Sequence, residues 1–420
     1  MQRSRGYSTR AAVVATLCLA LLGAACARAA GPATPPSVVV ISLDGVRHDQ
    51  PDRGPFPALG RIAADGLRAG RLDPVTPAST FPGHVSLATG TYPDIHGILD
   101  NTFWDRTRGE RFDYSNDAGW IEAEPLWAAA ERQGVPAATF FWVGSETDWR
   151  GVGARHRRAP FDSKIGEAEK VAQIVAWLER PAAERPRLVM SWWHGTDHAG
   201  HRKGPDHPDV AAALAAQDRH LGDLLAALDA RGAWEHTTLL VVSDHGMTTA
   251  EHTIPLEATL RDAGVDARVE LGSALAHVFV AGRQEIAVTL AADALAGLEG
   301  LRIERRAAVA GSLRLAHPDR CGDLVAIAEP GYTFRSGGLL ARVGDLLGGR
   351  RGLHGYGPDH PDMAGILFAM GRGVAPGARI ERARMIDVAA TVAALLGIDA
   401  PADSEGEPIA GIGTGVAPQP

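Results

Sequence analysis

Runs of consecutive apolar, often β-branched residues alternate with amphipathic segments along most of this chain, and this alternation restricts the fold more than any other feature. A run that is apolar at every position is typical of a strand buried on both faces of a sheet. Strands that alternate with helices favour a mostly parallel sheet with helices on both faces. We therefore expect an α/β fold. Strands are predicted at 37–43 (SVVVISL), 135–142, 187–193, 237–242 and 364–371.

The same patterns predict one large domain over residues 36–398. Its expected helices occupy 57–67, 124–134, 164–179, 208–231 and 385–398. Residues 265–345 are more mixed, with short strand-like pieces and Gly-rich turns, so we expect a small irregular subdomain inserted there. Residues 399–420 are rich in Pro, Gly and Ala and are assigned to a C-terminal tail.

The first 30 residues have the pattern of a signal peptide. A positively charged start precedes an apolar segment, AAVVATLCLALLGAA, which is short for a membrane span, and Ala27 and Ala29 form a small-residue cleavage pattern. We expect export to the periplasm or the medium, with no membrane span after signal removal. A retained anchor and a lipoprotein linked at Cys26 are the alternatives. The lipoprotein ranks second because Gly23 stands where a lipidation signal usually has a Leu-like residue.

Charge and cysteine content narrow the classes of function. The formal net charge of −8 provides no basic surface for a nucleic-acid polymer, so we expect a small-molecule partner. Of three cysteines, Cys18 and Cys26 lie in or beside the signal, which leaves Cys321 without a disulfide partner. Nothing in these patterns indicates an oligomeric state.

Carboxylate and imidazole side chains gather just after the predicted strands, in segments that we expect to be loops. In open α/β sheets, this edge is where ligands bind. Carboxylates and imidazoles suit zinc and similar metals, and two groups of three could hold two ions with open positions for a substrate. Each residue alone is also compatible with a turn or a cap, but their joint occurrence favours metal binding. The candidates are Asp44, Asp197, His201, Asp244, His245 and His354.

Residues 77–87 (PASTFPGHVSL) have the pattern of a helix start. Thr80 is a candidate N-cap, and Pro82 suits a first helical turn. A metal beside this hydroxyl would give Thr80 a second role, because metal coordination can activate a hydroxyl as a nucleophile.

Taken together, these stretches resemble the nucleotide pyrophosphatase/phosphodiesterase family of the alkaline phosphatase superfamily. The resemblance extends from about residue 38 to 398, in the family's order. It implies an alkaline-phosphatase-like sandwich with a mostly parallel central sheet. The stretches that carry it are ISLDGVR, STFPGHVSLATGTYPDIHGILDN, FFWVGSE, TDHAGHRKGPDHPD, VVSDHGM, LHGYGPDHPDM and IDVAATVAALLGI.

The resemblance further implies two zinc ions and a set of substrate contacts. Asn101 matches an asparagine that hydrogen-bonds a non-bridging phosphate oxygen. Phe81 and Trp192 lie where the family has aromatic residues that would sandwich a base, although core packing is the alternative for both. One ion would be held by Asp197, His201 and His354, and the other by Asp44, Asp244 and His245, with Thr80 on the second ion as nucleophile.

The expected reaction is hydrolysis of phosphodiester or pyrophosphate bonds, in nucleotides or related small molecules, through a phosphothreonine intermediate. Neutral Asn101 suits a diester, which presents less charge at phosphorus than a monoester. Arg150, Arg155, Arg157 and Arg158 are interpreted as surface or loop residues. A phosphomonoesterase of the same superfamily is the alternative. A metal-binding protein without catalysis is disfavoured because it has no use for Thr80.

Three departures from the family pattern surround the site. Gly83 stands where the family usually has Asn, Gly195 and Thr196 stand where it often has Glu-Pro, and Gly357 replaces an Asp. None of these positions is a predicted ligand, so the departures affect the choice of substrate more than the metals.

Overall fold

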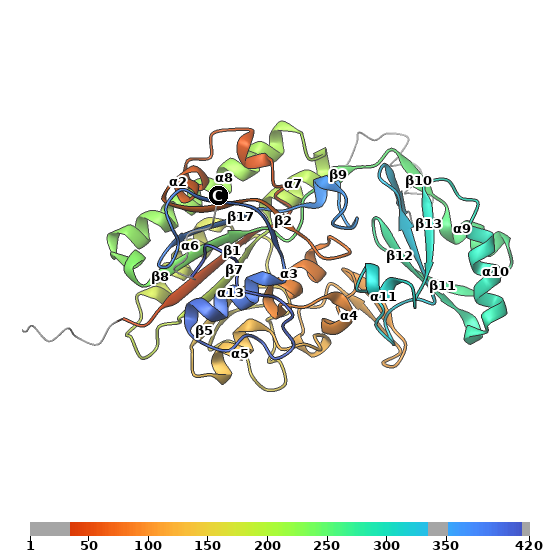
Figure 1. Ribbon diagram of the computed structural model, residues 1–420, viewed down its shortest axis with the longest axis horizontal. Helices are drawn as coiled ribbons and strands as arrows, with labels where there is room; N and C mark the ends of the chain where they lie inside the picture. Colours follow the sequence, from red (N-terminus) through yellow and green to blue (C-terminus); the bar gives the residue numbers. More distant parts are fainter. Residues whose placement is uncertain (1–33, 335–351, 414–420) are drawn as a thin grey trace, which may run out of the picture. The chain divides into compact units, whose positions relative to one another are not determined.

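In the computed structural model, which describes residues 34–334 and 352–413, an eight-stranded sheet forms the centre of the chain (Figure 1). Its order is β18-β2-β17-β8-β1-β7-β5-β6, and only β17 runs antiparallel to its neighbours, which confirms the mostly parallel sheet. The strands are β1 (Ser37–Leu43), β2 (Gly66–Asp73), β5 (Ala137–Phe140), β6 (His156–Arg158), β7 (Leu188–Trp193), β8 (Thr237–Val242), β17 (Leu367–Gly371) and β18 (Ala378–Arg384). The expected signal peptide lies outside the described residues.

The three central strands determine where the site lies. Every residue of β1, β7 and β8 is buried, as expected for continuous apolar runs covered on both faces. β1 pairs in parallel with both other strands, so that Ser42 lies opposite Trp192 on one side and Val242 on the other. The carboxyl ends of the three strands therefore reach the same edge of the sheet.

Helices form two sets that cover the sheet (Figure 1). In one set, α2 and α6 pack on the long helix α8, and α7 lies against the same helix. In the other, α3, α5 and α13 contact one another. Their bounds are α2 (Pro57–Asp65), α3 (Thr80–Thr89), α5 (Leu126–Arg132), α6 (Glu167–Leu178), α7 (Gly195–Lys203), α8 (Pro208–Ala230) and α13 (Asp387–Leu396), and the short α4 (Pro93–His96) follows α3. Within the two described ranges, every helix is too short or too polar to cross a bilayer.

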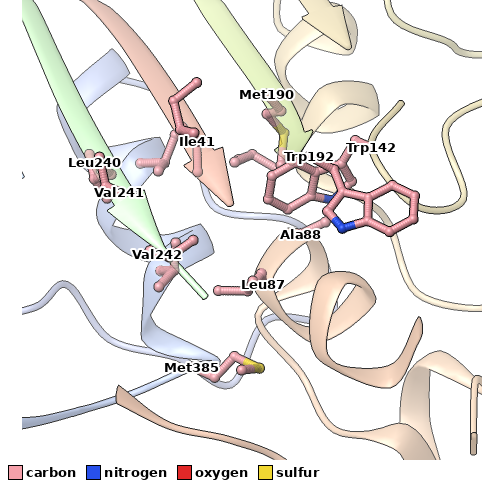
Figure 2. Packing of buried hydrophobic residues seen from close by; sticks show 14 of the residues in the cluster. Ile41, Leu87, Ala88, Trp142, Met190, Trp192, Leu240, Val241, Val242 and Met385 are labelled. Carbon is pink, nitrogen blue, oxygen red and sulfur yellow. The ribbon is translucent and has the colours of Figure 1, made fainter. Parts of the chain in front are cut away.

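Helix α3 is buried along its whole length. All ten of its residues are shielded from solvent, and its apolar residues are not confined to one face. Figure 2 shows Leu87 and Ala88 of this helix among buried side chains at the strand ends, including Val242 and Trp192. Because packing surrounds α3, the position of its first residue, Thr80, is fixed by the core.

A second, antiparallel sheet lies within the stretch expected to be an insertion. Its order is β11-β12-β14-β13, and it has its own cluster of buried apolar residues that includes Val278, Leu295 and Leu324. Residues 335–345 of the expected insertion lie outside the described chain. The elements are α9 (Leu256–Asp262), β11 (Ala267–Leu271), β12 (Leu275–Val280), α10 (Glu285–Leu295), β13 (Leu301–Arg305), α11 (Val309–Ser312) and β14 (Leu324–Ala328).

Three short two-stranded pairings complete the described chain. A hairpin joins β3 to β4. Separately, the described part of the tail, residues 399–413, buries Ile409 and Ile412 against the core. The pairs are β3 (Thr102–Asp105) with β4 (Glu110–Asp113), β9 (Thr248–Thr249) with β16 (Gly352–Leu353), and β10 (His252–Ile254) with β15 (Tyr332–Phe334).

Candidate active site

The common edge of β7, β1 and β8 carries the predicted ligand residues. Asp44 directly follows β1, and Asp244 and His245 follow β8 after one residue. His354 arrives from a distant part of the chain, because β16, which ends one residue before it, pairs with β9 just after the β8 loop. The structure thus brings together residues that are more than 300 positions apart in the sequence.

Asp197 and His201 lie on helix α7, whereas we expected them in a loop. A Gly- and His-rich composition suggested a loop, but Gly195–Lys203 forms two and a half helical turns. Residues four apart lie on one face of a helix, so the helix points both side chains the same way. The His201 Nε2 and Asp197 Oδ1 atoms are 3.4 Å apart.

Asp197, His201 and His354 form a first group of three potential ligands. Their ligand atoms all lie within 4.8 Å of one another. His354 Nε2 lies 3.1 Å from His201 Nε2 and 3.9 Å from Asp197 Oδ1. This is the same set that the family resemblance implied for one ion.

A second group surrounds His245. Its Nε2 atom lies 3.5 Å from Asp44 Oδ1, 3.2 Å from Asp244 Oδ2 and 3.3 Å from Thr80 Oγ1. Asp197 also belongs here, because its carboxylate, Asp44 and His245 have ligand atoms within 4.8 Å of one another. Asp197 therefore lies between the two groups, which sequence spacing did not indicate.

The hydrogen bonds of the three imidazoles fix which nitrogen faces the site. His201 donates from Nδ1 to the Gly352 carbonyl, His354 to the Ala78 carbonyl and His245 to the Gly246 carbonyl. A ring whose Nδ1 carries the proton has a lone pair at Nε2. All three Nε2 atoms therefore face the site as electron donors, the arrangement expected of metal-ligating histidines.

Three buried carboxylate oxygens in the site have no hydrogen-bond partner: Asp44 Oδ1, Asp197 Oδ1 and Asp244 Oδ2. Burial of an oxygen without a partner costs folding free energy. Here the three carboxylate oxygens and the three imidazole lone pairs also repel one another. Cations at this position would satisfy both sets. The residues present therefore fit a metal-binding site, with a carboxylate and imidazole composition that suits zinc.

The pKa values of Asp44 and Asp244 are shifted in opposite directions. Burial, followed by the charges of Asp244 and Asp197, raises the pKa of Asp44 well above its ordinary value. Burial would also raise the pKa of Asp244, but the nearby imidazoles of His245 and His84 hold it well below the ordinary value. The difference follows from the neighbours: the carboxylates of Asp244 and Asp197 act on Asp44, whereas two imidazoles act on Asp244.

Thr80 is the first residue of α3 and does not cap it. The N-cap is Ser79, and neither side chain makes the capping bond that the sequence suggested for Thr80. The Thr80 hydroxyl instead faces His245. Because Thr80 occupies the amino-terminal turn, it lies at the positive end of the helix dipole, where anions bind favourably.

Asn101 is oriented by a backbone contact to α3. Its Oδ1 atom accepts the Phe81 amide N–H at 2.9 Å. The side-chain amide therefore turns its Nδ2 donor away from that contact. The phosphate contact that the resemblance implies for this donor stays a prediction.

The two aromatic candidates lie beside the site but are largely buried. Phe81 is 4% exposed and packs edge to face against Phe112 and Tyr114. Trp192 is 8% exposed, and its indole N–H donates to Asp44 Oδ2 at 2.8 Å. Their proposed contact with a base stays a prediction.

Two further residues contact the predicted site residues. His84 lies 3.3 Å from Asp244 Oδ2 through Nδ1 and contacts Ser42 through Nε2. Lys170, fully buried on α6, donates to the Trp192 carbonyl at 2.9 Å. The sequence signalled His84 only by its nearness to Thr80, and it gave no signal for Lys170, which interrupts an apolar helix face.

The close approach of α3 to Asp244 accounts for glycine at position 83, where the family usually has Asn. A Cβ at this position would lie 2.9 Å from both the Cβ and the carbonyl oxygen of Asp244. Gly45, with φ +68°, permits a similar approach, because a Cβ there would meet Asp197 at 2.9 Å. These two glycines let α3 and the β1 loop approach the acidic residues closely.

The arginines between residues 150 and 158 are engaged away from the site. Arg155 pairs with Glu131, Arg157 with Asp148 and Arg158 with Glu169. Arg150 donates to the Glu122 carbonyl and covers the Trp149 ring. The interpretation of these residues as surface and loop groups agrees with their contacts.

Comparisons with known proteins agree with the resemblance. The family model described as type I phosphodiesterase / nucleotide pyrophosphatase matches residues 38–357. A pyrophosphatase/phosphodiesterase of Schizosaccharomyces pombe is 29% identical over 351 residues, which are 80% of this chain and 71% of that protein. Human ectonucleotide pyrophosphatase/phosphodiesterase family member 1 is 32% identical over 224 residues, 52% of this chain and 24% of that protein.

Solved structures share the fold. Human ectonucleotide pyrophosphatase/phosphodiesterase 5 has a TM-score of 0.77 at 25% identity, and the match covers 87% of this chain and 96% of that one. The murine protein gives 0.78 at 24% identity with the same coverage, and its inactive threonine-to-alanine variant has been solved in complex with AMP. These likenesses confirm the predicted fold. Against its worm relatives the chain spans only 44% and 49% of their length, and against the viper venom phosphodiesterase 25%.

Proposed function

This chain belongs to the type I phosphodiesterase/nucleotide pyrophosphatase family, and on that premise we propose that it hydrolyses phosphodiester or pyrophosphate bonds in nucleotides or related small molecules. The observation that carries the proposal is the convergence of unpartnered carboxylate oxygens and imidazole Nε2 atoms beside the Thr80 hydroxyl. A buried set of donors next to a hydroxyl at a helix N-terminus suits the transfer of a phosphoryl group.

We assign two zinc ions to this site. Zinc supplies two effects when bound: it favours ionisation of a coordinated hydroxyl, and it stabilises negative charge on a leaving oxygen. The donor types support zinc over magnesium, because imidazole nitrogens are poor ligands for magnesium. One ion is assigned to Asp197, His201 and His354, and the other to Asp44, Asp244, His245 and Thr80.

Thr80 acts as the nucleophile in this proposal. Thr80 gives up its hydroxyl proton to solvent, and Oγ1 forms a bond to phosphorus while the bond from phosphorus to the leaving oxygen breaks, which gives a phosphothreonine. Water then forms a new bond to phosphorus as the bond to Oγ1 breaks, and the proton that water gives up replaces the one lost from Oγ1. The packing around α3 keeps Oγ1 in place through both steps, so little reorganisation is needed.

The backbone and Asn101 hold the phosphate. The amino-terminal end of α3 attracts the charged oxygens, and Asn101 contributes the Nδ2 donor that its contact with Phe81 leaves free. No positively charged side chain between residues 150 and 158 is left to bind a second phosphate charge, since all four arginines have other partners. This favours a diester or an anhydride over a monoester.

Two nitrophenyl substrates test the proposal. Zinc-loaded enzyme should hydrolyse bis(4-nitrophenyl) phosphate faster than 4-nitrophenyl phosphate, and Thr80→Ala should reduce diester turnover by at least about a thousandfold. Faster monoester turnover would favour the phosphomonoesterase alternative. Diester turnover that survives in Thr80→Ala would show that another group is the nucleophile.

We also propose that the protein is exported after cleavage of residues 1–30. The support is the charged start, the short apolar segment and the small residues around Ala29. The mass of the secreted or periplasmic protein tests this. A mature chain that begins near Gly31 agrees with cleavage, whereas a lipid-modified Cys26 at the amino terminus indicates a lipoprotein.

A further inference from the structure

Tyr114 is an exposed aromatic residue at the entrance to the proposed active site. It follows directly on β4 and is 57% exposed, one of four exposed large apolar side chains among the described residues. Its φ of +49° lies in the left-handed region that favours glycine. A bulky residue held in such a conformation is unusual and often marks a functional position.

Two contacts connect Tyr114 with the phosphate-binding residues. Its amide donates to the Asn101 carbonyl at 3.0 Å. Its ring meets the Phe81 ring at a centroid distance of 5.6 Å and an angle of 84°. Because Phe81 is itself 4% exposed, Tyr114 supplies the exposed aromatic surface of this ring pair.

The hydroxyl of Tyr114 lies close to the polar part of the site. Partial burial and the charge of Asp100 raise its pKa, and a hydrogen bond with the Asn101 side chain opposes the rise. The charge of Asp197, one of the assigned metal ligands, acts on the same hydroxyl. The residue therefore has its ring toward solvent and its polar end near Asn101.

The hairpin that carries Tyr114 is braced by the second sheet. Arg111 of β4 donates to Glu270 of β11 at 2.9 Å, and the Arg268 guanidinium covers the Trp104 ring at 3.5 Å. Glu270 is nearly fully buried, whereas the Arg111 side chain is 44% exposed, so the pair lies at the edge of the second sheet. The brace limits the movement of the hairpin and keeps the exposed ring at the entrance.

We propose that the ring of Tyr114 binds the organic substituent of the substrate and selects substituents with a planar face, such as a nucleoside or an aryl group. The inference rests on the proposed function and adds to it a residue that determines specificity. An aromatic ring favours planar groups because it can stack on their π faces, which a small alkyl group lacks.

Three diesters with the same leaving group test this inference. Bis(4-nitrophenyl) phosphate, thymidine 5′-(4-nitrophenyl phosphate) and methyl 4-nitrophenyl phosphate all release nitrophenolate but differ in the substituent that remains. Tyr114→Ala should lower kcat/KM about tenfold for the aryl and thymidine diesters and less than about twofold for the methyl diester. An equal loss on all three, or no loss, would overturn the inference.

Two control variants separate the ring from the hydroxyl and from exposure as such. Tyr114→Phe keeps the ring and loses the contact with Asn101, so it should change all three rates by the same factor. If it lost selectivity as Tyr114→Ala does, the ring would not be the determinant. Ile286→Ala, at an even more exposed residue of α10 (69%), should change none of the rates.

A binding measurement separates this inference from the proposed function. Calorimetry with thymidine 5′-monophosphate and methyl phosphate needs no turnover. Tyr114→Ala should weaken the nucleotide about tenfold and leave methyl phosphate unchanged. An enzyme that hydrolyses no diester would disprove the proposed function, whereas equal nucleotide affinity of wild type and Tyr114→Ala would disprove the role of Tyr114.

Discussion

The Nε2 atoms of His201 and His354 lie 3.1 Å apart although each ring donates its Nδ1–H to a backbone carbonyl. Two imidazole lone pairs that face each other at this distance repel. The Asp197 carboxylate approaches the same two atoms, so a cation bound among the three removes the repulsion.

Metal removal should therefore destabilise the fold as well as stop catalysis. Ligand binding to the native state contributes about 3 kcal/mol at a hundredfold excess over the Kd. We expect chelation by EDTA to lower the Tm by several degrees and added zinc to restore it, as followed by differential scanning fluorimetry. His354→Ala should show a smaller zinc-dependent rise. Equal Tm values before and after EDTA treatment would contradict the assignment, provided that metal analysis shows that EDTA removed the bound ions.

Gly83 should not tolerate the residue that the family usually has there. A Cβ would lie 2.9 Å from the Asp244 backbone oxygen, so Gly83→Asn must displace α3 or the Asp244 loop. We expect a loss of about 1–3 kcal/mol in the free energy of unfolding and a fall in kcat, because Thr80 moves with α3. Denaturant unfolding and diester kinetics measure both effects.

Gly60 provides the matched control for Gly83. It also lies in a helix, α2, but a Cβ there meets no atom within 4 Å. Gly60→Ala should leave activity unchanged and stabilise the protein by about 0.5–1 kcal/mol. If Gly83→Asn behaved like Gly60→Ala, the close approach of α3 to Asp244 would not matter for the site.

Trp192 should influence metal affinity through Asp44. Its indole N–H satisfies Asp44 Oδ2, which leaves Oδ1 directed at the site. Trp192→Phe keeps an aromatic ring and removes the donor, so we expect zinc affinity to fall about tenfold or more. Competition with a zinc-binding dye measures this. Trp193→Phe is the control, because the Trp193 indole donates to Ser191 instead.

The sequence predicted which candidate ligands come together better than it predicted their local structure. Asp44, Asp244 and His245 follow apolar runs, and the runs alone placed them at one sheet edge. The assignment of Asp197 and His201 to a loop was wrong. Gly195 and Gly200 give the segment a composition typical of loops, although the two ligand candidates have the i, i+4 spacing of a helix face. In the structure, Gly200 is where α7 packs against Met247, a contact that no local pattern encodes.

Other features depend on contacts between distant segments. Thr80 was correctly placed at a helix start, but its contact with His245 joins residues that are 165 positions apart in the sequence. Tyr114 follows a short polar hairpin whose sequence gives no sign of a binding role. Its position became visible only with the burial of Phe81 and the brace to Glu270, both of which are tertiary relations.

Asp100 should make the free energy of unfolding depend on pH, and Asp100→Asn should abolish this dependence. Burial raises the pKa of this carboxyl to about 6, although the Asn101 amide and Ser79 donate to it. The native state then binds the proton more tightly than the unfolded chain, so Asp100 stabilises the fold at low pH, and this contribution is lost as the pH rises from about 4 through 6. Asp100→Asn keeps the acceptor and carries no charge. It should exceed the wild type by about 3 kcal/mol at pH 7.5 and by about 1 kcal/mol at pH 4.5 in urea unfolding. The same difference at both pH values would mean that the carboxyl titrates normally in the folded protein.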